Sequence, residues 1–145
     1  MTLKNSKENA TITLISKQFS DGDEDKLEFT TSGGFYEKDG RFFITYSEQS
    51  DMGMEDSRVL LKIEPEAVTM RRMGDFATVM VYKKGEITDF CYKVPFGELN
   101  MKIKTQSIIN SLNKDGGRLF FSYMLYSGET VTQTDIEIYV KTEME

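Results

Sequence analysis

Residues 98–108 read ELNMKIKTQSI, and this stretch decides the fold class. Every second residue from Leu99 to Ile103 is apolar, and the residues between them are polar or charged. A period of two is typical of a β-strand with one buried and one solvated face. The same alternation recurs in residues 58–64 and 135–141. The chain is therefore expected to fold from half-buried strands.

Runs of β-branched and aromatic residues predict about ten strands along the chain. The intervals between these runs are short and contain turn residues, as in Asp39-Gly40, Lys84-Gly85 and Ser127-Gly128. Parallel neighbours need crossovers of about a dozen residues or more, so consecutive strands are expected to pair antiparallel as a meander. The expected strands lie near residues 10–19, 26–37, 41–49, 58–64, 67–73, 76–83, 86–94, 98–108, 118–126 and 130–141.

A long meander either splits into two packed sheets or closes on itself, and only closure removes the exposed sheet edges. We expect one all-β domain over residues 1–145, an antiparallel up-and-down meander closed into a barrel of about eight to ten strands. Residues 1–9 are expected to form a loose N-terminal segment. Gly33-Gly34 inside a strand-like run predicts a bulge or bend. The loop at residues 49–57 is interpreted either as a flap over the barrel mouth or as a disordered connection.

The composition excludes several classes of function. The 145 residues include no histidine, which removes Ser-His-Asp and Cys-His catalysis and histidine-bound metals. The single cysteine, Cys91, permits no intramolecular disulfide and is expected to be a buried, inert thiol. A net charge of −6 disfavours nucleic-acid binding. No signal peptide or membrane-spanning run is recognised, so we expect a cytoplasmic protein without a membrane partner, metal or cofactor.

Short motifs in a fixed order resemble those of the YwiB-like family of uncharacterised bacterial proteins. The resemblance covers nearly the whole chain and implies a calycin barrel, related in shape to the lipocalins. It implies no activity, because none is established for that family. The lipocalin Gly-x-Trp signature is absent, since the chain contains no tryptophan, and secreted transport is therefore not carried over. The motifs are Tyr46-Ser47-Glu48, Arg72-Met73-Gly74, Phe96-Gly97-Glu98-Leu99, Thr105-Gln106-Ser107-Ile108 and Gly117-Arg118 leading to Tyr123.

Arg72 is the leading candidate for a functional residue. Alternation along residues 68–72 places it on the inner face, where an isolated charge needs a partner. The same counting puts Tyr46 and Glu48 on one face, and Tyr123 faces inward from an aromatic strand. One hypothesis is that these four residues hold the carboxylate or phosphate of a ligand inside an apolar cavity. The alternative is a structural Arg–Glu ion pair that plugs the barrel end.

The strand expected near residues 118–126 is apolar on both faces. Its outer residues Phe120, Met124 and Tyr126 need a cover, either a neighbouring segment or a second subunit, so a homodimer is one expectation. Two leading functions follow from the sequence. One is non-enzymatic binding of a small, partly apolar molecule in the barrel interior. The other is a structural or protein-interaction module with a filled barrel, acting through its outer surface or a dimer face. An enzyme that uses arginine, tyrosine and carboxylates ranks last.

Overall fold

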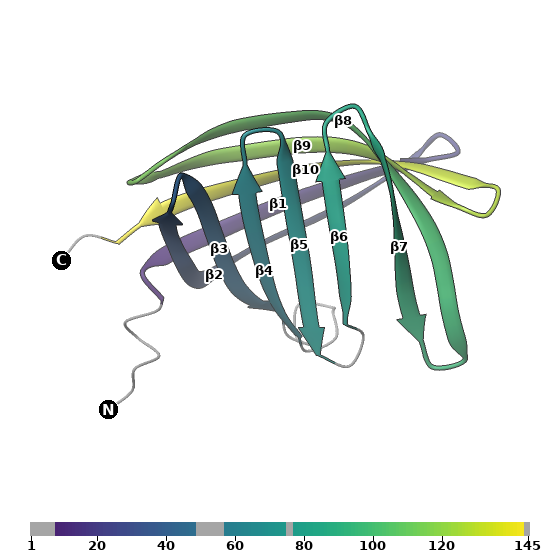
Figure 1. Ribbon diagram of the computed structural model, residues 1–145, viewed down its shortest axis with the longest axis horizontal. Helices are drawn as coiled ribbons and strands as arrows, with labels where there is room; N and C mark the ends of the chain where they lie inside the picture. Colours follow the sequence, from purple (N-terminus) through teal and green to yellow (C-terminus); the bar gives the residue numbers. More distant parts are fainter. Residues whose placement is uncertain (1–7, 49–56, 75–76, 144–145) are drawn as a thin grey trace.

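The computed structural model describes residues 8–48, 57–74 and 77–143, with the backbone alone at residues 48, 57, 74 and 92–94. The described residues form ten β-strands and no helix (Figure 1). The strands are β1 (Ala10–Ser20), β2 (Asp23–Lys38), β3 (Arg41–Glu48), β4 (Ser57–Glu64), β5 (Ala67–Gly74), β6 (Thr78–Lys83), β7 (Ile87–Val94), β8 (Gly97–Asn113), β9 (Gly116–Ser127) and β10 (Thr130–Thr142).

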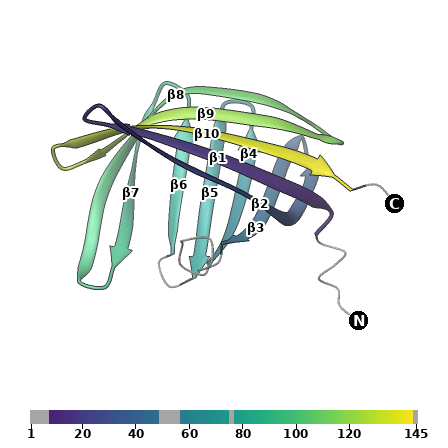
Figure 2. The same ribbon diagram turned by 180° about the vertical axis from the view of Figure 1, so that it is seen from behind.

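All ten strands belong to one antiparallel sheet with the order β6-β5-β4-β3-β2-β1-β10-β9-β8-β7. The first strand pairs with the last, from Ala10 opposite Thr142 to Phe19 opposite Gln133. The sheet curls so that β3 to β6 face β8 to β10 across the interior (Figures 1 and 2). The prediction of an all-β antiparallel meander closed into a barrel is therefore confirmed.

Closure is incomplete between β6 and β7, the two ends of the strand order. We call this junction the seam. In the described part of the chain no ladder joins the two strands, and two threonine side chains bridge them instead. Thr88 Oγ1 donates to the carbonyl oxygen of Val81, and Thr78 Oγ1 donates to that of Cys91 at 3.3 Å.

Tight turns explain why some strands are longer than the sequence pattern predicts. Asp21 and Gly22 have positive φ angles of 52° and 83°, and Asp39 and Gly40 have 55° and 79°. Two consecutive positive φ values are those of a type I′ hairpin turn, which keeps the flanking residues paired. As a result β2 already begins at Asp23, inside the acidic run that the strand pattern had left out.

β8 extends to Asn113, beyond the end expected near residue 108, and it contains a bulge that interrupts the alternation. The register with β9 shifts between Thr105 and Ser107, so Gln106 is an extra residue. The bulge resets the alternation, which is why Thr105 and Ile108 are both buried. The irregularity expected at Gly33-Gly34 takes another form. β2 pairs with β1 up to Gly33 and with β3 from Gly33 onward, without a register shift.

Gly33 is required by the close approach of two backbones. A Cβ at this position would lie 2.3 Å from the carbonyl oxygen of Thr45 and 2.8 Å from Ile12 Cγ1. The glycine therefore lets β2 leave β1 and join β3 at a corner of the barrel. Asn9, which the sequence places in the loose N-terminal segment, is bonded through its side chain to both backbone groups of Phe35, at 2.8 and 2.9 Å. The loop at residues 49–56 lies outside the described residues.

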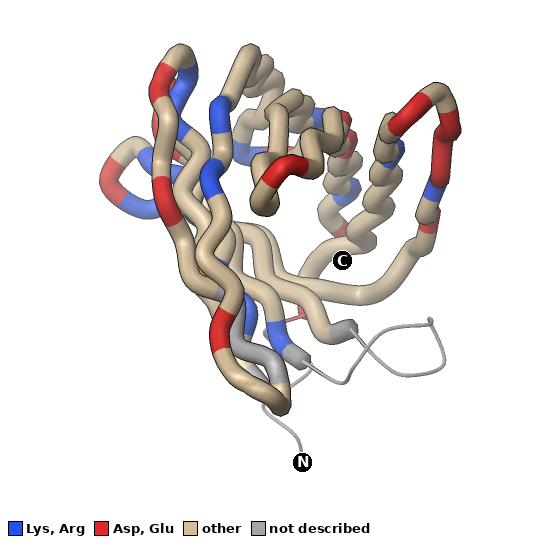
Figure 3. The backbone as a smooth tube through the Cα atoms, turned by 90° about the vertical axis from the view of Figure 1, so that its right-hand side faces the viewer, with Lys and Arg blue, Asp and Glu red and all other residues tan. Residues whose placement is uncertain are grey.

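One apolar cluster fills the interior and involves every strand from β1 to β10 except β7, whose Phe90 packs against it half-buried. Acidic and basic residues are distributed over the strands and turns (Figure 3). Within the described residues, no helix has the length and apolar character needed to cross a membrane. The fully buried side chains at the centre include Ile12, Ile44, Leu61, Ile63, Ile103, Leu119, Phe121 and Ile138.

Candidate functional site

The strand register places Tyr46 and Arg72 in one row across the inner face of the sheet. Tyr46 on β3 lies opposite Val59 on β4, and Val59 lies opposite Arg72 on β5. The row ends at Thr78 on β6. Tyr46, Val59 and Thr78 are buried and Arg72 is half-buried. The sheet therefore brings a guanidinium and a phenol to the same level of the barrel.

Glu48 stands one inward-facing position further along β3, opposite Ser57. Its side chain lies outside the described residues, so its pairing with Arg72 stays a prediction. Gly74 on β5 is opposite the same Ser57. The backbones of Glu48, Ser57 and Gly74 thus form the row next to that of Tyr46, Val59 and Arg72. Glu48 is the last residue of β3, Ser57 the first of β4 and Gly74 the last of β5.

Tyr123 approaches the same region from the other half of the barrel. It lies on β9 opposite Thr105 on β8 and Thr134 on β10, and only 6% of its surface is exposed. Its ring centroid is 4.7 Å from that of Tyr82 on β6, with the rings tilted by 50°. Tyr82 also contacts Phe121, at 4.8 Å between centroids. A cluster of three aromatic rings thus spans the interior from β6 to β9.

The electrostatics link Arg72 to both phenols. Burial raises the pKa of Tyr82 well above its ordinary value of 10.0, and the neighbouring Tyr123 raises it further. Burial likewise raises the pKa of Tyr123, while a hydrogen bond with Tyr82 acts in the opposite direction. The guanidinium of Arg72 lowers the pKa of both phenols without cancelling the effect of burial. Both hydroxyls therefore keep their protons at neutral pH and can donate hydrogen bonds.

Thr105 contributes a buried hydroxyl to this region. The residue is 0% exposed, and its Oγ1 has no hydrogen-bond partner among the described residues. A buried polar atom left unpaired costs about 1–3 kcal/mol, so such atoms are uncommon in protein interiors. Thr105 Oγ1 therefore marks a position where an additional polar group would be stabilising.

The sequence pattern places Arg72, Tyr46 and Tyr123 on the inner face, and it does not single out Tyr82 and Thr105, which lie in the same region. Alternation with Met80 was the available signal for Tyr82, and alternation with Ile103 was the signal for Thr105. The importance of both residues depends on which strands face each other, and a period-two pattern does not contain that information. Together these five residues place hydroxyl groups and one cation on apolar walls, an arrangement that suits the polar end of a small molecule.

The described residues contain no group of three or more His, Cys, Asp or Glu side chains that could hold a metal ion. A family model described as "Domain of unknown function (DUF1934)" matches residues 12–138, which is most of the chain. The chain belongs to the DUF1934 family.

The uncharacterized beta-barrel protein YwiB of Bacillus subtilis (strain 168) is similar over 125 residues at 30% identity. The match covers 85% of this chain and 87% of that protein. The crystal structure of the ywiB protein from Bacillus subtilis has the same fold, with a TM-score of 0.84 at 24% identity over 99% of this chain and 100% of that chain. The family resemblance and the barrel expected from the sequence are thereby confirmed.

In this DUF1934 barrel the lone thiol is more accessible than its sequence neighbours indicate. Cys91 is half-buried, so the expectation of a buried thiol is wrong. Phe90 packs against the core, and alternation therefore turns Cys91 toward the opposite face of β7.

The outer face of β9 receives part of its cover from the chain itself. Phe120, Met124 and Tyr126 are all half-buried rather than exposed. The guanidinium carbon of Arg118 lies 5.4 Å from the centroid of the Phe120 ring, and Arg118 is ion-paired with Glu137 on β10. Such a cation–π contact shields one side of the ring. This cover comes from β9 itself, because Arg118 stands two residues before Phe120 on the same strand. The covers expected from the sequence, a neighbouring segment or a second subunit, stay predictions.

Proposed function

We propose that this protein is a non-enzymatic, cytoplasmic binding protein that holds a small, partly apolar molecule inside a calycin-like barrel. Arg72, Tyr46, Glu48 and Tyr123 are the residues proposed to surround the polar end of the ligand, joined by Tyr82. The observation that carries the proposal is the cluster of phenols and a guanidinium inside an otherwise apolar interior.

The polar groups of the interior are more than a stable barrel requires. A core packed only for stability is best served by apolar side chains, because each buried polar group must find a partner. This interior instead holds the hydroxyl of Thr105, which lacks a described partner, beside the paired phenols of Tyr82 and Tyr123. A ligand that accepts hydrogen bonds would pair the threonine hydroxyl and lie next to Arg72, while apolar walls would enclose the rest of it.

Two fluorescent probes of similar shape test the proposal. Anilinonaphthalene sulfonate carries an anionic group, and N-phenyl-naphthylamine is its neutral counterpart. We expect both to bind the native protein saturably. Arg72→Met should weaken the sulfonate about tenfold, which corresponds to about 1.4 kcal/mol, and leave the neutral probe unaffected.

Arg71→Met is the matched control, because Arg71 is the adjacent residue on β5 and is exposed on the opposite face. Circular dichroism at the titration temperature establishes that each variant is folded. Equal effects of the two arginine variants, or no saturable binding of either probe, would contradict the proposal. Native mass spectrometry of protein purified from its own cells should then show a co-purifying small molecule.

The second candidate function is a structural or interaction module with a filled barrel. The specific observation in its favour is the exposure of large apolar side chains on the outside, above all Phe96, which is 85% exposed. Persistent absence of an adduct, together with no probe binding, would favour this second function.

A further inference from the structure

The β7–β8 hairpin extends beyond the strands that flank it. β7 and β8 pair from Ile87 opposite Lys104 to Val94 opposite Gly97. The ladder between β8 and β9 begins only at Lys102, which lies opposite Tyr126. We call residues 89–102 the arm. In the described structure, the part of β8 from residue 97 to residue 101 therefore has β7 on one side and no strand on the other.

The pictures show the same separation. The arm turns away from the hairpin of β9 and β10, which leaves the barrel in a different direction (Figures 1 and 2). A two-stranded ribbon is marginally stable by itself, and an unpaired strand edge is a template for pairing with another chain. The free edge of β8 is thus a position where a further strand would be stabilising.

The arm also exposes apolar side chains. Phe96 at its tip is 85% exposed, the highest value among the large apolar residues described, and Leu99 in the middle of the free edge is 39% exposed. Ile87, where β7 enters the arm, is 59% exposed. An aromatic side chain carries about 150–250 Å² of surface that can be buried on contact, and its exposure is unfavourable in an isolated molecule.

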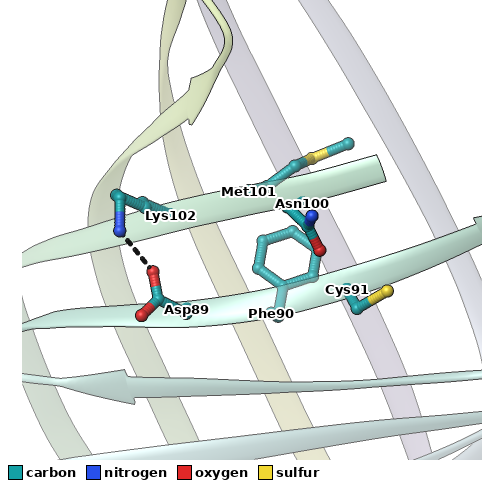
Figure 4. Close-up of a pocket in the computed structure, with 6 residues that line it drawn as sticks. All are labelled: Asp89, Phe90, Cys91, Asn100, Met101 and Lys102. Carbon is teal, nitrogen blue, oxygen red and sulfur yellow. Dashed lines mark hydrogen bonds and ion pairs between the residues drawn. The ribbon is translucent and has the colours of Figure 1, made fainter. Parts of the chain in front are cut away.

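A cavity lies on the same arm, further from its tip than Phe96. It has a volume of about 510 Å³. One edge is closed by an ion pair in which Lys102 Nζ lies 2.7 Å from Asp89 Oδ1, and the ring of Phe90 forms part of the wall (Figure 4). The volume falls in the range of about 300–1,000 Å³ that is usual for ligand pockets. The residues that line it are Asp89, Phe90, Cys91, Asn100, Met101 and Lys102.

We propose that two copies of this chain associate through their arms, with the free edges of β8 paired antiparallel. Two identical five-residue segments overlap completely in only one antiparallel register, which places Leu99 opposite Leu99 of the second copy. Gly97 then lies opposite Met101 of the second copy. This arrangement has two-fold symmetry, so each chain gives and receives the same contacts.

The register also brings the exposed side chain and the cavity together. In this register Phe96 lies level with Lys102 of the second copy, and alternation places it on the same face as Asn100 and Lys102, which line the cavity of that copy. Each phenylalanine is therefore expected to contact the cavity of the other chain.

The charges agree with the same register. Glu98 lies opposite Asn100 of the second copy and diagonal to both its Lys102 and its Glu98, so no like charges lie directly opposite each other. One segment thus supplies the edge, the apolar residue and the cavity that receives it. That self-complementarity is the reason for assigning a second copy, rather than an unrelated chain, to this surface. The contact is smaller than a standard protein interface, so we expect it to dissociate in the micromolar range.

Cysteine cross-linking tests the register. In a Cys91→Ser background, Leu99→Cys should form a disulfide-linked dimer under mild oxidation. Residues directly opposite in an antiparallel pair have Cα atoms about 4.5–5.5 Å apart, within the disulfide range of about 4.4–6.8 Å. Ile109→Cys in the same background is the matched control, since Ile109 is on the same strand and 50% exposed but outside the arm. It should remain monomeric.

Sedimentation velocity tests the contact without a cross-link. The unmodified chain should show a concentration-dependent dimer, and Phe96→Asp should weaken it at least tenfold. Val79→Asp, at a position 41% exposed on β6, should leave the dimer unchanged. A monomer at high micromolar concentration overturns the proposal, as does a dimer that resists Phe96→Asp or cross-links equally at residues 99 and 109. These outcomes are independent of probe binding in the interior.

Discussion

The barrel closes differently at its two junctions. β1 and β10, the two ends of the chain, meet in a continuous ladder from Ala10 opposite Thr142 to Phe19 opposite Gln133. β6 and β7 are neighbours in sequence, yet no ladder joins them in the described residues, and the side chains of Thr78 and Thr88 bridge them instead. In a meander whose ends pair with each other, the gap in the barrel can therefore fall at a hairpin.

The hydrogen bonds of the turn between β6 and β7 give a physical reason. The amide of Gly85 donates to the carbonyl of Thr105 at 2.9 Å, and the amide of Thr105 donates to the carbonyl of Glu86 at 3.3 Å. The turn is thus held against β8 at the bulge instead of continuing a ladder between its own strands. This geometry leaves β7 to follow β8 into the arm.

Core truncation should give the largest contrast between the two junctions. Ile138 on β10 is 0% exposed, so Ile138→Ala should lower the free energy of unfolding by about 3 kcal/mol. Ile87→Ala, at a position 59% exposed beside the seam, should lower it by less than about 0.5 kcal/mol. Urea denaturation followed by circular dichroism measures both. Equal losses would mean that the seam is packed as tightly as the closed junction.

Tyr82, which lies next to the seam on β6, should make the free energy of unfolding fall at alkaline pH. Its pKa in the folded protein is raised above the unfolded value by burial, so the folded state keeps a proton that the unfolded state loses. The stabilisation that the protonated phenol of Tyr82 contributes is fully present below about pH 10. It is lost as the pH rises through the pKa of the folded state. For one such group the free energy of unfolding changes by at most about 1.4 kcal/mol per pH unit.

Tyr82→Phe should therefore reduce the decline in unfolding free energy above pH 10, measured by urea denaturation at several pH values. Thr88→Val is the control, because it removes no titratable group. It should lower the free energy of unfolding equally at every pH and leave the slope of that free energy against pH unchanged. An unchanged slope in Tyr82→Phe would show that Tyr82 is not the group responsible.

The threonine bridge should give the smallest effect. Thr88→Val keeps the shape of the side chain but leaves the carbonyl of Val81 without its donor, so we expect a loss of about 1 kcal/mol. Thr13→Val removes an exposed hydrogen bond of 3.0 Å to Thr30 on the laddered side and should cost less than about 0.5 kcal/mol. If the two losses are equal in thermal or urea unfolding, the bridge does not hold the seam.

Most of the fold could be predicted from the alternation of residues, while the site could be predicted only in part. Arg72 and Tyr46 were found because their own strands show which face is inside. The sequence does not single out Tyr82 and Thr105, because Tyr82 meets Tyr123 across the barrel and Thr105 meets it through the pairing of β8 with β9. The bulge at Gln106 was equally hidden, since one extra residue changes the facing of every later residue in β8 without altering its composition.

The sequence by itself determined that the chain is all-β, that consecutive strands turn back on each other, and, where a strand is regular, which of its two faces is apolar. These properties are local, because they follow from a period of two and from turn residues such as Asp39-Gly40. Only the tertiary structure decided where the barrel stays open and which side chains meet inside it. It also decided that part of β8 has a free edge. These depend on pairing between residues far apart in the chain, and the free energy of such pairing is set by the closed sheet as a whole.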